Sequence, residues 1–380
     1  MTVCKEKGNE LHGIYESVDW DWDDWSQHFR RRIQTLDELK KYIDVTPDEE
    51  SAIQKSAGIY KWAVTPYYAS LMDKEDPNCP IRRQAIPSLE EFTTYNYSDV
   101  DPVGDTKYRV GNRIVHKYAD RIIMLITEQC PVYCRHCTRK FHTTNLNGTY
   151  FESSESESYE PDFLYIENHQ EIRDVLLTGG DPLTYSDTKL EKILKRLRSI
   201  PHVEIIRFGS RYPVLLPQRI TKEFCEMLEK YHPIWLNTHF NHPKEITKDS
   251  AKAINLLLTH GVPVQNQSVL LKGINDDLEI MKKLLHNLLK IRVRPYYLYH
   301  CDNVTGVSHF MTTIDTGLDI MKGLVGHTTG FATPSYVITT INGKIPLPLN
   351  TVVEYSEDGL ILKNYQDKET SLPYLTPKDS

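Results

Sequence analysis

Long apolar runs and an excess of positive charge are both missing from this sequence of 380 residues. No apolar run reaches the roughly 18–20 residues that a helix needs to cross a bilayer. The first residues, MTVCKEKGNELHG, contain no apolar core of the kind that signal peptides have. The formal net charge of -7 argues against a protein whose main role is to bind nucleic acid or an anionic membrane. We therefore expect a cytoplasmic protein with neither a membrane partner nor a nucleic-acid partner.

Cysteines are also few, and their odd number, seven, does not suit a disulfide framework. Three of them lie close together in the run Cys130-Pro-Val-Tyr-Cys134-Arg-His-Cys137. Thiolates are ligands of iron–sulfur clusters and of zinc. A structural zinc site usually takes four ligands, and a zinc knuckle completed by His136 or His142 is the alternative here. Three thiolates bind a [4Fe–4S] cluster and leave one iron open to a small chelating ligand, which is the interpretation we favour.

The chain divides into three parts by its sequence pattern. Residues 1–105 are polar and interrupted by prolines, which predicts a lobe of short helices. Residues 106–335 alternate short β-branched runs with amphipathic stretches such as 186–200 and 276–291, which predicts parallel βα units. Residues 336–380 form a C-terminal segment with an extended run and an apolar strand near residues 359–362. The acidic stretch 151–163 is predicted to be a surface loop without an assigned role.

The central part contains six predicted strands, which indicates an α/β fold. These strands are Arg121–Thr127, Arg173–Thr178, Val203–Phe208, Ile234–Thr238, Pro263–Leu270 and Arg294–Tyr299. Right-handed crossovers between them predict a partial (β/α)6 TIM-like barrel. The cysteines follow the first of these strands, and polar motifs follow or lie on the other five, among them Gly179-Gly180-Asp181 after the second. Because the strand ends of such a barrel converge, we expect one site at this rim.

In order along the chain, these motifs resemble the lysine 2,3-aminomutase family of radical S-adenosylmethionine (SAM) enzymes. The run EQCPVYCRHCTRK is similar to the cluster loop of that family. The similarity covers about residues 105–350 and includes LLTGGDPL, HVEIIRFGSRYPVLLPQRIT, WLNTHFNHPKEIT, VQNQSVLLKGIND, RVRPYYLYHCD and GLVGHTTG. The resemblance implies a radical SAM fold with a [4Fe–4S] cluster, SAM and pyridoxal 5′-phosphate (PLP). It also implies an isomerase that moves the α-amino group of an amino acid from C2 to C3.

The resemblance implies a SAM site beside the open iron. Gly179 and Gly180 allow the backbone to approach a ligand closely, and Asp181 is expected to accept a hydrogen bond from the SAM amino group. Gln267 matches a family residue near SAM, although a satisfied polar core residue is the alternative. His136, within the cluster loop, either orients ligands or only packs.

By the same resemblance, Lys344 in the turn Asn342-Gly343-Lys344 is the lysine that bonds to PLP. A solvated turn lysine is the alternative, and the turn has one glycine where the lysine enzyme has a run. Arg121 matches a phosphate-binding arginine, and Lys117 stands where the family has another arginine. Tyr118 and Tyr299 match tyrosines that line the ring and the substrate, with plain barrel packing as the alternative.

The expected substrate pocket is formed by Arg139, Asp302 and Thr339. Arg139 matches the family arginine that pairs with the substrate carboxylate. Asp302 matches one of two aspartates that bind the distal ammonium, and Thr339 replaces the other. A single carboxylate still favours a cationic side chain, so L-lysine is the first expectation and arginine is the alternative. Glutamate fits less well because Asp302 repels its side chain.

Two further hypotheses belong to other classes. One is a radical SAM enzyme that acts on a protein lysine, and the other is a non-catalytic metal-binding protein on a degenerate barrel. An electron donor such as flavodoxin or ferredoxin is expected for a radical SAM enzyme. A homo-oligomer is possible, but the C-terminal run SLPYLTPKDS lacks the cysteine cluster of the clostridial-type lysine enzyme, so its intersubunit zinc is not expected.

Overall fold

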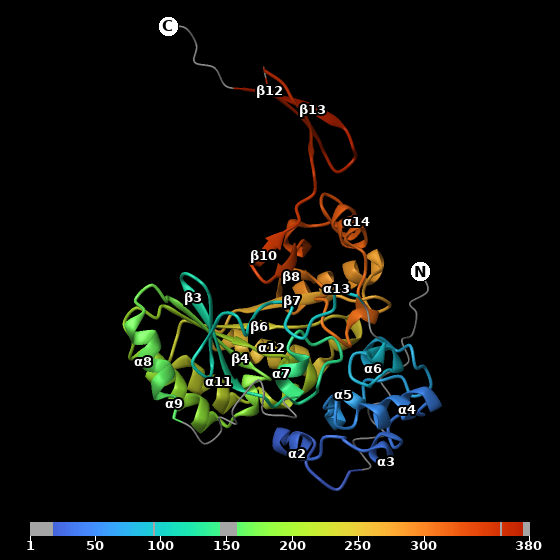
Figure 1. Cartoon of the computed structure of the whole chain (residues 1–380), viewed down its shortest axis with the longest axis vertical. Helices are drawn as coiled ribbons and strands as arrows, with labels where there is room; N and C mark the ends of the chain where they lie inside the picture. The colour runs from blue at the N-terminus through green and yellow to red at the C-terminus, as the bar shows by residue number, and fades with distance from the viewer. Residues whose placement is uncertain (1–17, 94–95, 145–157, 358, 375–380) are drawn as a thin grey trace.

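The computed structural model describes residues 18–93, 96–144, 158–357 and 359–374. Its centre is one ten-stranded sheet whose strands follow the chain order (Figure 1). From β3 to β9 each neighbouring pair is parallel, and β1, β2 and β10 add antiparallel edges. Since β1 and β10 remain edges, the described residues form an open barrel. The strands are β1 (Arg109–Val110), β2 (Ile114–Tyr118), β3 (Arg121–Thr127), β4 (Asp174–Gly179), β5 (Ile205–Gly209), β6 (Ile234–Thr238), β7 (Val264–Leu270), β8 (Arg294–His300), β9 (Ser335–Thr340) and β10 (Gly343–Pro346).

Helices cover the outer face of this sheet, because the sequence between the strands is amphipathic. In α9, for example, Leu190, Leu194 and Leu197 are buried in the same core as Ile206 and Phe208 of β5. The long crossover helices are α8 (Glu160–Asn168), α9 (Asp187–Arg198), α11 (Lys222–Glu229), α12 (Lys248–Thr259), α13 (Leu278–Lys290) and α14 (Ile314–Leu324). The shorter ones are α7 (Lys140–Thr144), α10 (Tyr212–Leu215), η3 (Pro182–Thr184), η4 (Pro217–Arg219), η5 (Pro243–Glu245), η6 (Ser308–Phe310) and η7 (Gly330–Ala332).

The inner face of the sheet is less buried than the outer face. On β5 the side chains alternate between buried (Ile206 and Phe208) and half-buried (Ile205 and Arg207), and β3, β4 and β8 begin with a similar alternation. A closed eightfold barrel fills its interior with packed side chains. Here polar and aromatic side chains of intermediate exposure line the interior instead, which leaves this face available to ligands.

The six predicted strands are all confirmed, and their bounds differ from the observed ones by at most two residues at either end. The predicted helical stretches 186–200 and 276–291 are confirmed as α9 and α13. The sheet nevertheless continues past residue 335, because β9 pairs in parallel with β8 and the turn after β9 leads into β10. Lys344 therefore lies on a strand of the main sheet.

The N-terminal lobe consists of short helices, as predicted from its prolines. These are α2 (Trp25–Arg30), α3 (Leu36–Leu39), α4 (Pro47–Ser56), α5 (Pro66–Ala69), α6 (Pro80–Arg83) and η1 (Leu89–Phe92). Proline begins three of them, where the missing N–H has no helical partner to lose. Tyr67 and Tyr68 of α5 are buried and donate or share hydrogen bonds with Thr247 and Glu245 of the barrel, so the lobe packs directly on the barrel.

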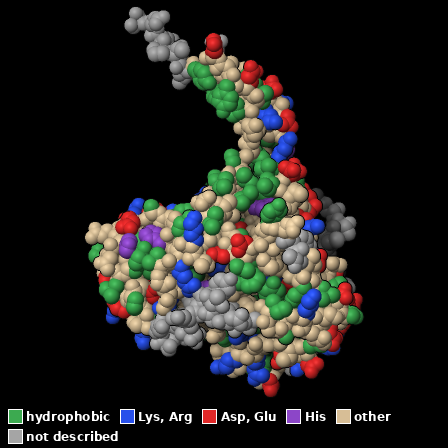
Figure 2. Space-filling model, in the orientation of Figure 1, with side chains coloured by type: hydrophobic (Ala, Val, Ile, Leu, Met, Phe, Trp, Pro, Cys, Tyr) green, Lys and Arg blue, Asp and Glu red, His purple; other side chains and the backbone are tan. Residues whose placement is uncertain are grey.

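Beyond the barrel, β11 (Val352–Tyr355), β12 (Gly359–Lys363) and β13 (Glu369–Pro373) form a separate three-stranded sheet that projects from the body (Figure 1). Hydrophobic side chains are exposed along this arm (Figure 2), including Tyr355 at 73% and Leu372 at 54%. Of the acidic stretch 151–163, residues 151–157 lie outside the described residues, and α8 begins at Glu160 where a loop was predicted. Among the described helices, none combines the length and apolarity that crossing a membrane requires.

Candidate active site

The three cysteines lie on one loop between β3 and α7, and all three are free thiols. Burial, together with the neighbouring Cys134, raises the pKa of Cys137 to about 11. Burial likewise raises the pKa of Cys130, with additional contributions from Asp181, Cys137 and Cys134. Three sulfurs that repel one another as thiolates suit a cationic cluster, which removes that repulsion.

A mononuclear metal site is less well supported. Among the described residues, no three His, Cys, Asp or Glu side chains converge closely enough to bind a single ion. A [4Fe–4S] cluster places each thiolate on a different iron, so its ligands lie farther apart than those of one zinc ion. Three cysteines on one loop are compatible with such a cluster.

The N-terminal lobe holds the cluster loop through a buried charge cluster. Glu91 of η1 forms a two-pronged ion pair with Arg135, and its Oε2 also lies 2.6 Å from Lys140 Nζ. Lys140 also donates to the Gly306 carbonyl at 2.8 Å. Burial alone raises the pKa of Glu91, but the two cations overcome this effect and bring it to about 2. Arg135 and Lys140 both belong to the loop, so Glu91 fixes its conformation.

Replacing Glu91 with glutamine will therefore destabilise the protein by about 3 kcal/mol or more, because two buried cations lose their counter-charge. The same variant will retain less iron after anaerobic reconstitution. Unfolding midpoints and iron content measure the two effects. The neighbouring Glu90→Gln is the matched control, since Glu90 is exposed. Equal behaviour of the two variants would contradict the assigned role of Glu91.

Arg211, which follows β5, contacts the cluster loop from the barrel side. Its Nη1 lies 2.9 Å from Cys134 Sγ, and its Nη2 lies 2.8 Å from Glu245 Oε1. Nε donates to the His239 carbonyl at 2.8 Å. These contacts fix the guanidinium against the cluster loop, so Arg211 positions the Cys134 side chain.

The glycines after β4 make their closest contacts with the cluster loop itself. A side chain on Gly179, whose φ is +133°, would lie 2.2 Å from the Thr127 carbonyl oxygen, and one on Gly180 would lie 2.4 Å from that of Gln129. The Asp181 amide donates to the Gln129 carbonyl at 2.8 Å. These glycines therefore let the chain after β4 pack directly on the segment that leads to Cys130. Their contact with SAM stays a prediction.

Asp181 is occupied by protein donors. Its Oδ1 accepts from Ser210 Oγ at 2.8 Å and from the Leu183 amide at 3.1 Å, and its Oδ2 accepts from the Arg211 amide at 2.7 Å. Burial raises its pKa to about 6 despite these bonds. The carboxylate thus joins the loops after β4 and β5, and Oδ2 keeps one lone pair for a ligand.

Beside the cysteines lie buried polar atoms without a hydrogen-bond partner among the described residues. They are His136 Nδ1, His239 Nε2, Asn237 Nδ2 and Thr238 Oγ1. The rings of His136 and His239 are 5.5 Å apart, and burial lowers the pKa of each well below the usual value, which keeps both neutral. Unsatisfied buried groups are costly, and a polar ligand such as SAM would satisfy them. Gln267 on β7 is half-buried, and Tyr297 is its partner on the neighbouring strand β8.

Lys344 lies on β10, directly after the turn that follows the carboxyl end of β9. Its amide donates to Tyr118 Oη at 3.1 Å, and Thr339 is its partner across the β9–β10 hairpin. Its ammonium lies 4.7 Å from the ring centre of Tyr297 and 5.1 Å from that of Tyr299. Gly343 has a φ of +122°, which favours glycine at this turn. Two aromatic rings therefore flank the side chain of Lys344.

Desolvation, together with the charges of Arg207, Arg121 and Arg139, lowers the pKa of Lys344 from 10.5 to about 8. A lowered lysine pKa means that the neutral amine becomes the main form above about pH 8 rather than above 10.5. PLP attachment to Lys344, trapped with borohydride and located by peptide mass spectrometry, will therefore rise with a midpoint near pH 8. A midpoint near that of exposed lysines, measured on Lys322 in the same digest, would contradict the lowered pKa.

The two predicted phosphate ligands differ in what they contact. Arg121 has its guanidinium 4.0 Å from the ring centre of Tyr118 and pairs with Asp120 at 2.7 Å through Nη1 alone. Lys117 donates instead to two backbone carbonyls, those of Val103 at 2.8 Å and Thr340 at 2.5 Å. Arg121 is thus free to bind an anion, whereas Lys117 is engaged by the chain.

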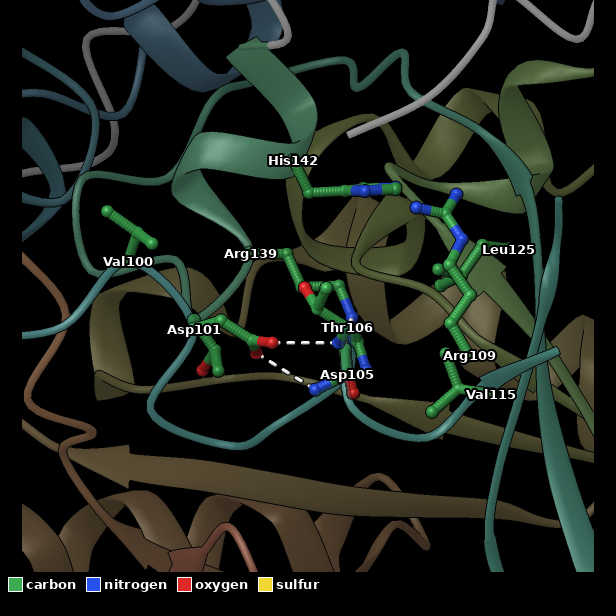
Figure 3. A pocket seen from close by; sticks show the side chains of 10 residues that line it. Val100, Asp101, Asp105, Thr106, Arg109, Val115, Leu125, Arg139 and His142 are labelled. Atoms are coloured by element: carbon green, nitrogen blue, oxygen red, sulfur yellow. Dashed lines mark hydrogen bonds and ion pairs between the residues drawn. The ribbon is translucent and has the colours of Figure 1, made fainter. Parts of the chain in front are cut away.

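Arg139, one of the predicted substrate residues, lies beside Asp101 and Asp105 of the linker before β1 (Figure 3). Arg139 pairs through Nε with Asp105 at 2.6 Å, and the amide of Asp105 is held by Asp101 at 2.9 Å. Asp302 Oδ2 accepts from Thr138 Oγ1 at 2.6 Å. Burial raises the pKa of Asp302 to about 6, and Thr138 and Arg139 offset part of this rise. Asp302 is therefore a carboxylate whose charge is incompletely compensated, which suits an incoming cation.

A small cavity of about 30 Å³ adjoins this group, and Thr138, Arg139 and Asp105 are among the residues that line it. Sequence reasoning missed Asp105, Glu91 and Arg211 because their partners are far away in the chain. Arg207 could have been identified from the sequence, because it lies between two apolar residues of the run Ile205–Gly209. In a strand this alternation places its side chain on the inner face.

The open parallel sheet and the three-cysteine loop at its rim define a radical SAM enzyme, and the family model of the radical SAM superfamily matches residues 124–285. A second family model, lysine-2,3-aminomutase, matches residues 321–379. The chain belongs to the lysine 2,3-aminomutase family, whose members are isomerases that bind a [4Fe–4S] cluster, SAM and PLP.

Several curated relatives carry this conclusion. The L-lysine 2,3-aminomutases of Acetoanaerobium sticklandii and Clostridium subterminale are each 47% identical to this chain. The first alignment covers 91% of this chain and 83% of the relative, and the second covers 94% and 86%. The glutamate 2,3-aminomutase of Clostridioides difficile is 41% identical over 96% of this chain and 85% of its own length.

Proposed function

We propose that this chain moves the α-amino group of a basic L-amino acid, L-lysine first, from C2 to C3 to give the β-amino acid. Cys130, Cys134 and Cys137 bind the cluster, and Lys344 bonds to PLP. The polar group beside the cysteines, including His136, Gln267 and the free lone pair of Asp181, binds SAM. When bound, the cluster and SAM supply hydrogen-atom abstraction, and PLP supplies a conjugated ring that delocalises an unpaired electron.

The residues around Lys344 prepare it for this task. Its lowered pKa of about 8 provides a neutral amine at moderate pH, and a neutral amine is the nucleophilic form. Tyr299 is half-buried beside it, and burial raises the phenol pKa well above the usual value, so the hydroxyl stays protonated and able to donate. Tyr118 fixes the hairpin through the Lys344 amide.

The charges of the pocket support a basic substrate. Arg139 uses Nε for Asp105, so its two terminal nitrogens remain for a carboxylate. Asp302 has a single hydroxyl donor and a raised pKa of about 6, so an ammonium or guanidinium would compensate it. Thr339 lies across the hairpin from Lys344 and is uncharged, so it adds no second carboxylate. The incompletely compensated Asp302 carries the proposal of a cationic side chain.

A substrate panel tests the proposal. Anaerobically reconstituted protein with SAM, PLP and dithionite receives L-lysine, L-arginine or L-glutamate, and chiral mass spectrometry detects the β-isomer. We expect turnover of L-lysine and little turnover of L-glutamate, since Asp302 repels a carboxylate. Preference for L-arginine would keep the cationic pocket and change the substrate. Preference for L-glutamate would refute the role of Asp302.

This chemistry also determines which partner the protein needs. The reduced cluster requires a one-electron donor, and we propose a small acidic protein such as flavodoxin or ferredoxin in a cytoplasmic setting. Replacement of dithionite by reduced flavodoxin in the same assay tests this partner.

A further inference from the structure

We infer that Arg121 and Arg207, on the inner face of the sheet, form an anion site. In this site Arg207 is a further residue that binds the phosphate of PLP. In this arrangement Lys117 is a positioning residue for the Lys344 hairpin. The inference rests on the proposed function, because it concerns the cofactor that Lys344 binds.

Arg207 points into the barrel interior near Lys344. It occupies the half-buried inner position of β5, beside Leu176 of β4 and Trp235 of β6. Arg121 of β3 lies in register with Asp174 of β4, whose Oδ1 is 2.8 Å from Arg207 Nε, so the two arginines flank the same carboxylate. The Lys344 ammonium lies 4.7 Å from the ring centre of Tyr297, and burial, together with the charges of Arg207 and Arg121, lowers the pKa of Lys344. The two guanidiniums and Lys344 therefore surround one region of the interior.

Each guanidinium is oriented by a carboxylate that leaves donors free. Arg207 Nε pairs with Asp174 Oδ1 at 2.8 Å, and Arg121 Nη1 pairs with Asp120 Oδ1 at 2.7 Å. Within the described part of the chain, the other side-chain nitrogens of the two arginines have no hydrogen-bond partner. The carboxylates reduce the local charge but do not occupy the Nη1 and Nη2 fork of Arg207. A phosphate takes such forks through paired hydrogen bonds.

Lys117 is not equivalent to these arginines. Two of its three N–H donors are used by the Val103 and Thr340 carbonyls. Gly104, next to Val103, packs so closely on Ile341 that a side chain there would lie 2.6 Å from Ile341 Cγ1. Lys117 thus fastens the linker before β1 to the hairpin turn that precedes Lys344, and the phosphate site needs another cation.

Comparison of PLP with pyridoxal, which lacks the phosphate, tests this assignment without measuring turnover. Absorbance and fluorescence titrations of the reconstituted full chain give the affinity for each aldehyde. Arg207→Gln is expected to weaken PLP about tenfold to a hundredfold while pyridoxal affinity stays within about twofold. Lys117→Gln is expected to weaken both aldehydes to the same extent, because it displaces the hairpin and not the phosphate.

Arg207→Lys serves where the glutamine variant folds poorly, since it keeps the charge and loses the fork. It is expected to lose PLP selectively but less than the glutamine variant does. Equal weakening of PLP and pyridoxal by either Arg207 variant, or selective loss of PLP in Lys117→Gln, overturns the inference. Absence of any PLP adduct at Lys344 in the wild-type chain would instead refute the proposed function.

Discussion

Cys137→Ala will yield a folded protein that contains almost no cluster after anaerobic reconstitution, against about four irons per wild-type chain. Two thiolates are too few to hold a [4Fe–4S] cluster against competing thiols in solution, so iron and sulfide contents fall together. The charge-transfer absorbance of the cluster and the electron paramagnetic resonance signal of its reduced form will disappear. SAM cleavage and aminomutase turnover will fall below detection, because no other described group supplies an electron to SAM.

The fold should survive this change, which makes the result specific. Cys137 is half-buried on a loop that Glu91, Arg135 and Lys140 hold independently. The matched control is Cys225→Ala on α11, which removes a fully buried thiol far from the loop in sequence. It should retain full iron and full turnover with a modest loss of stability. A Cys137→Ala protein that still holds a full complement of iron would refute the cluster assignment.

The barrel was predictable because its strands combine strong periodicity with clear boundaries. β3 and β6 occur at the predicted bounds, since each is a continuous apolar run that begins and ends at polar or turn residues. The extra strands were harder to identify. β9 and β10 lie in a run whose inner face carries threonines and Lys344, so their place in the sheet depends on pairing with β8.

Residue roles were less predictable than strands, because they depend on which partner each side chain finds. Asp181 is bonded to Ser210 and to the Arg211 amide, contacts that join two loops about thirty positions apart in the chain. Lys117 finds backbone carbonyls where the family pattern implied a phosphate. Glu91 reveals its importance only when the lobe packs on the cluster loop. A single sequence names candidate groups, and packing decides which of them stay free for ligands.

Lys344→Ala will lower aminomutase turnover by at least about a thousandfold, because it removes the amine that lies beside the rings of Tyr297 and Tyr299. The variant should lose the near-400 nm band that borohydride shifts in the wild-type chain. Its iron content and its cleavage of SAM should remain close to wild type, since the three cysteines and the contacts of Glu91 and Arg211 that hold their loop are unchanged. Lys322→Ala on α14 is the matched control, because that lysine is exposed and pairs only with Asp367 of the arm.

Turnover, iron content and SAM cleavage together distinguish two roles for Lys344. A positioning lysine would affect turnover and cluster together or would be rescued by arginine, whereas a lysine bonded to PLP cannot be replaced by a guanidinium that stays protonated. Lys344→Arg should therefore be as inactive as Lys344→Ala while it restores the hairpin charge beside Arg121 and Arg207. If Lys344→Ala keeps its turnover, the chain is a radical SAM enzyme whose amino-group chemistry does not pass through this residue.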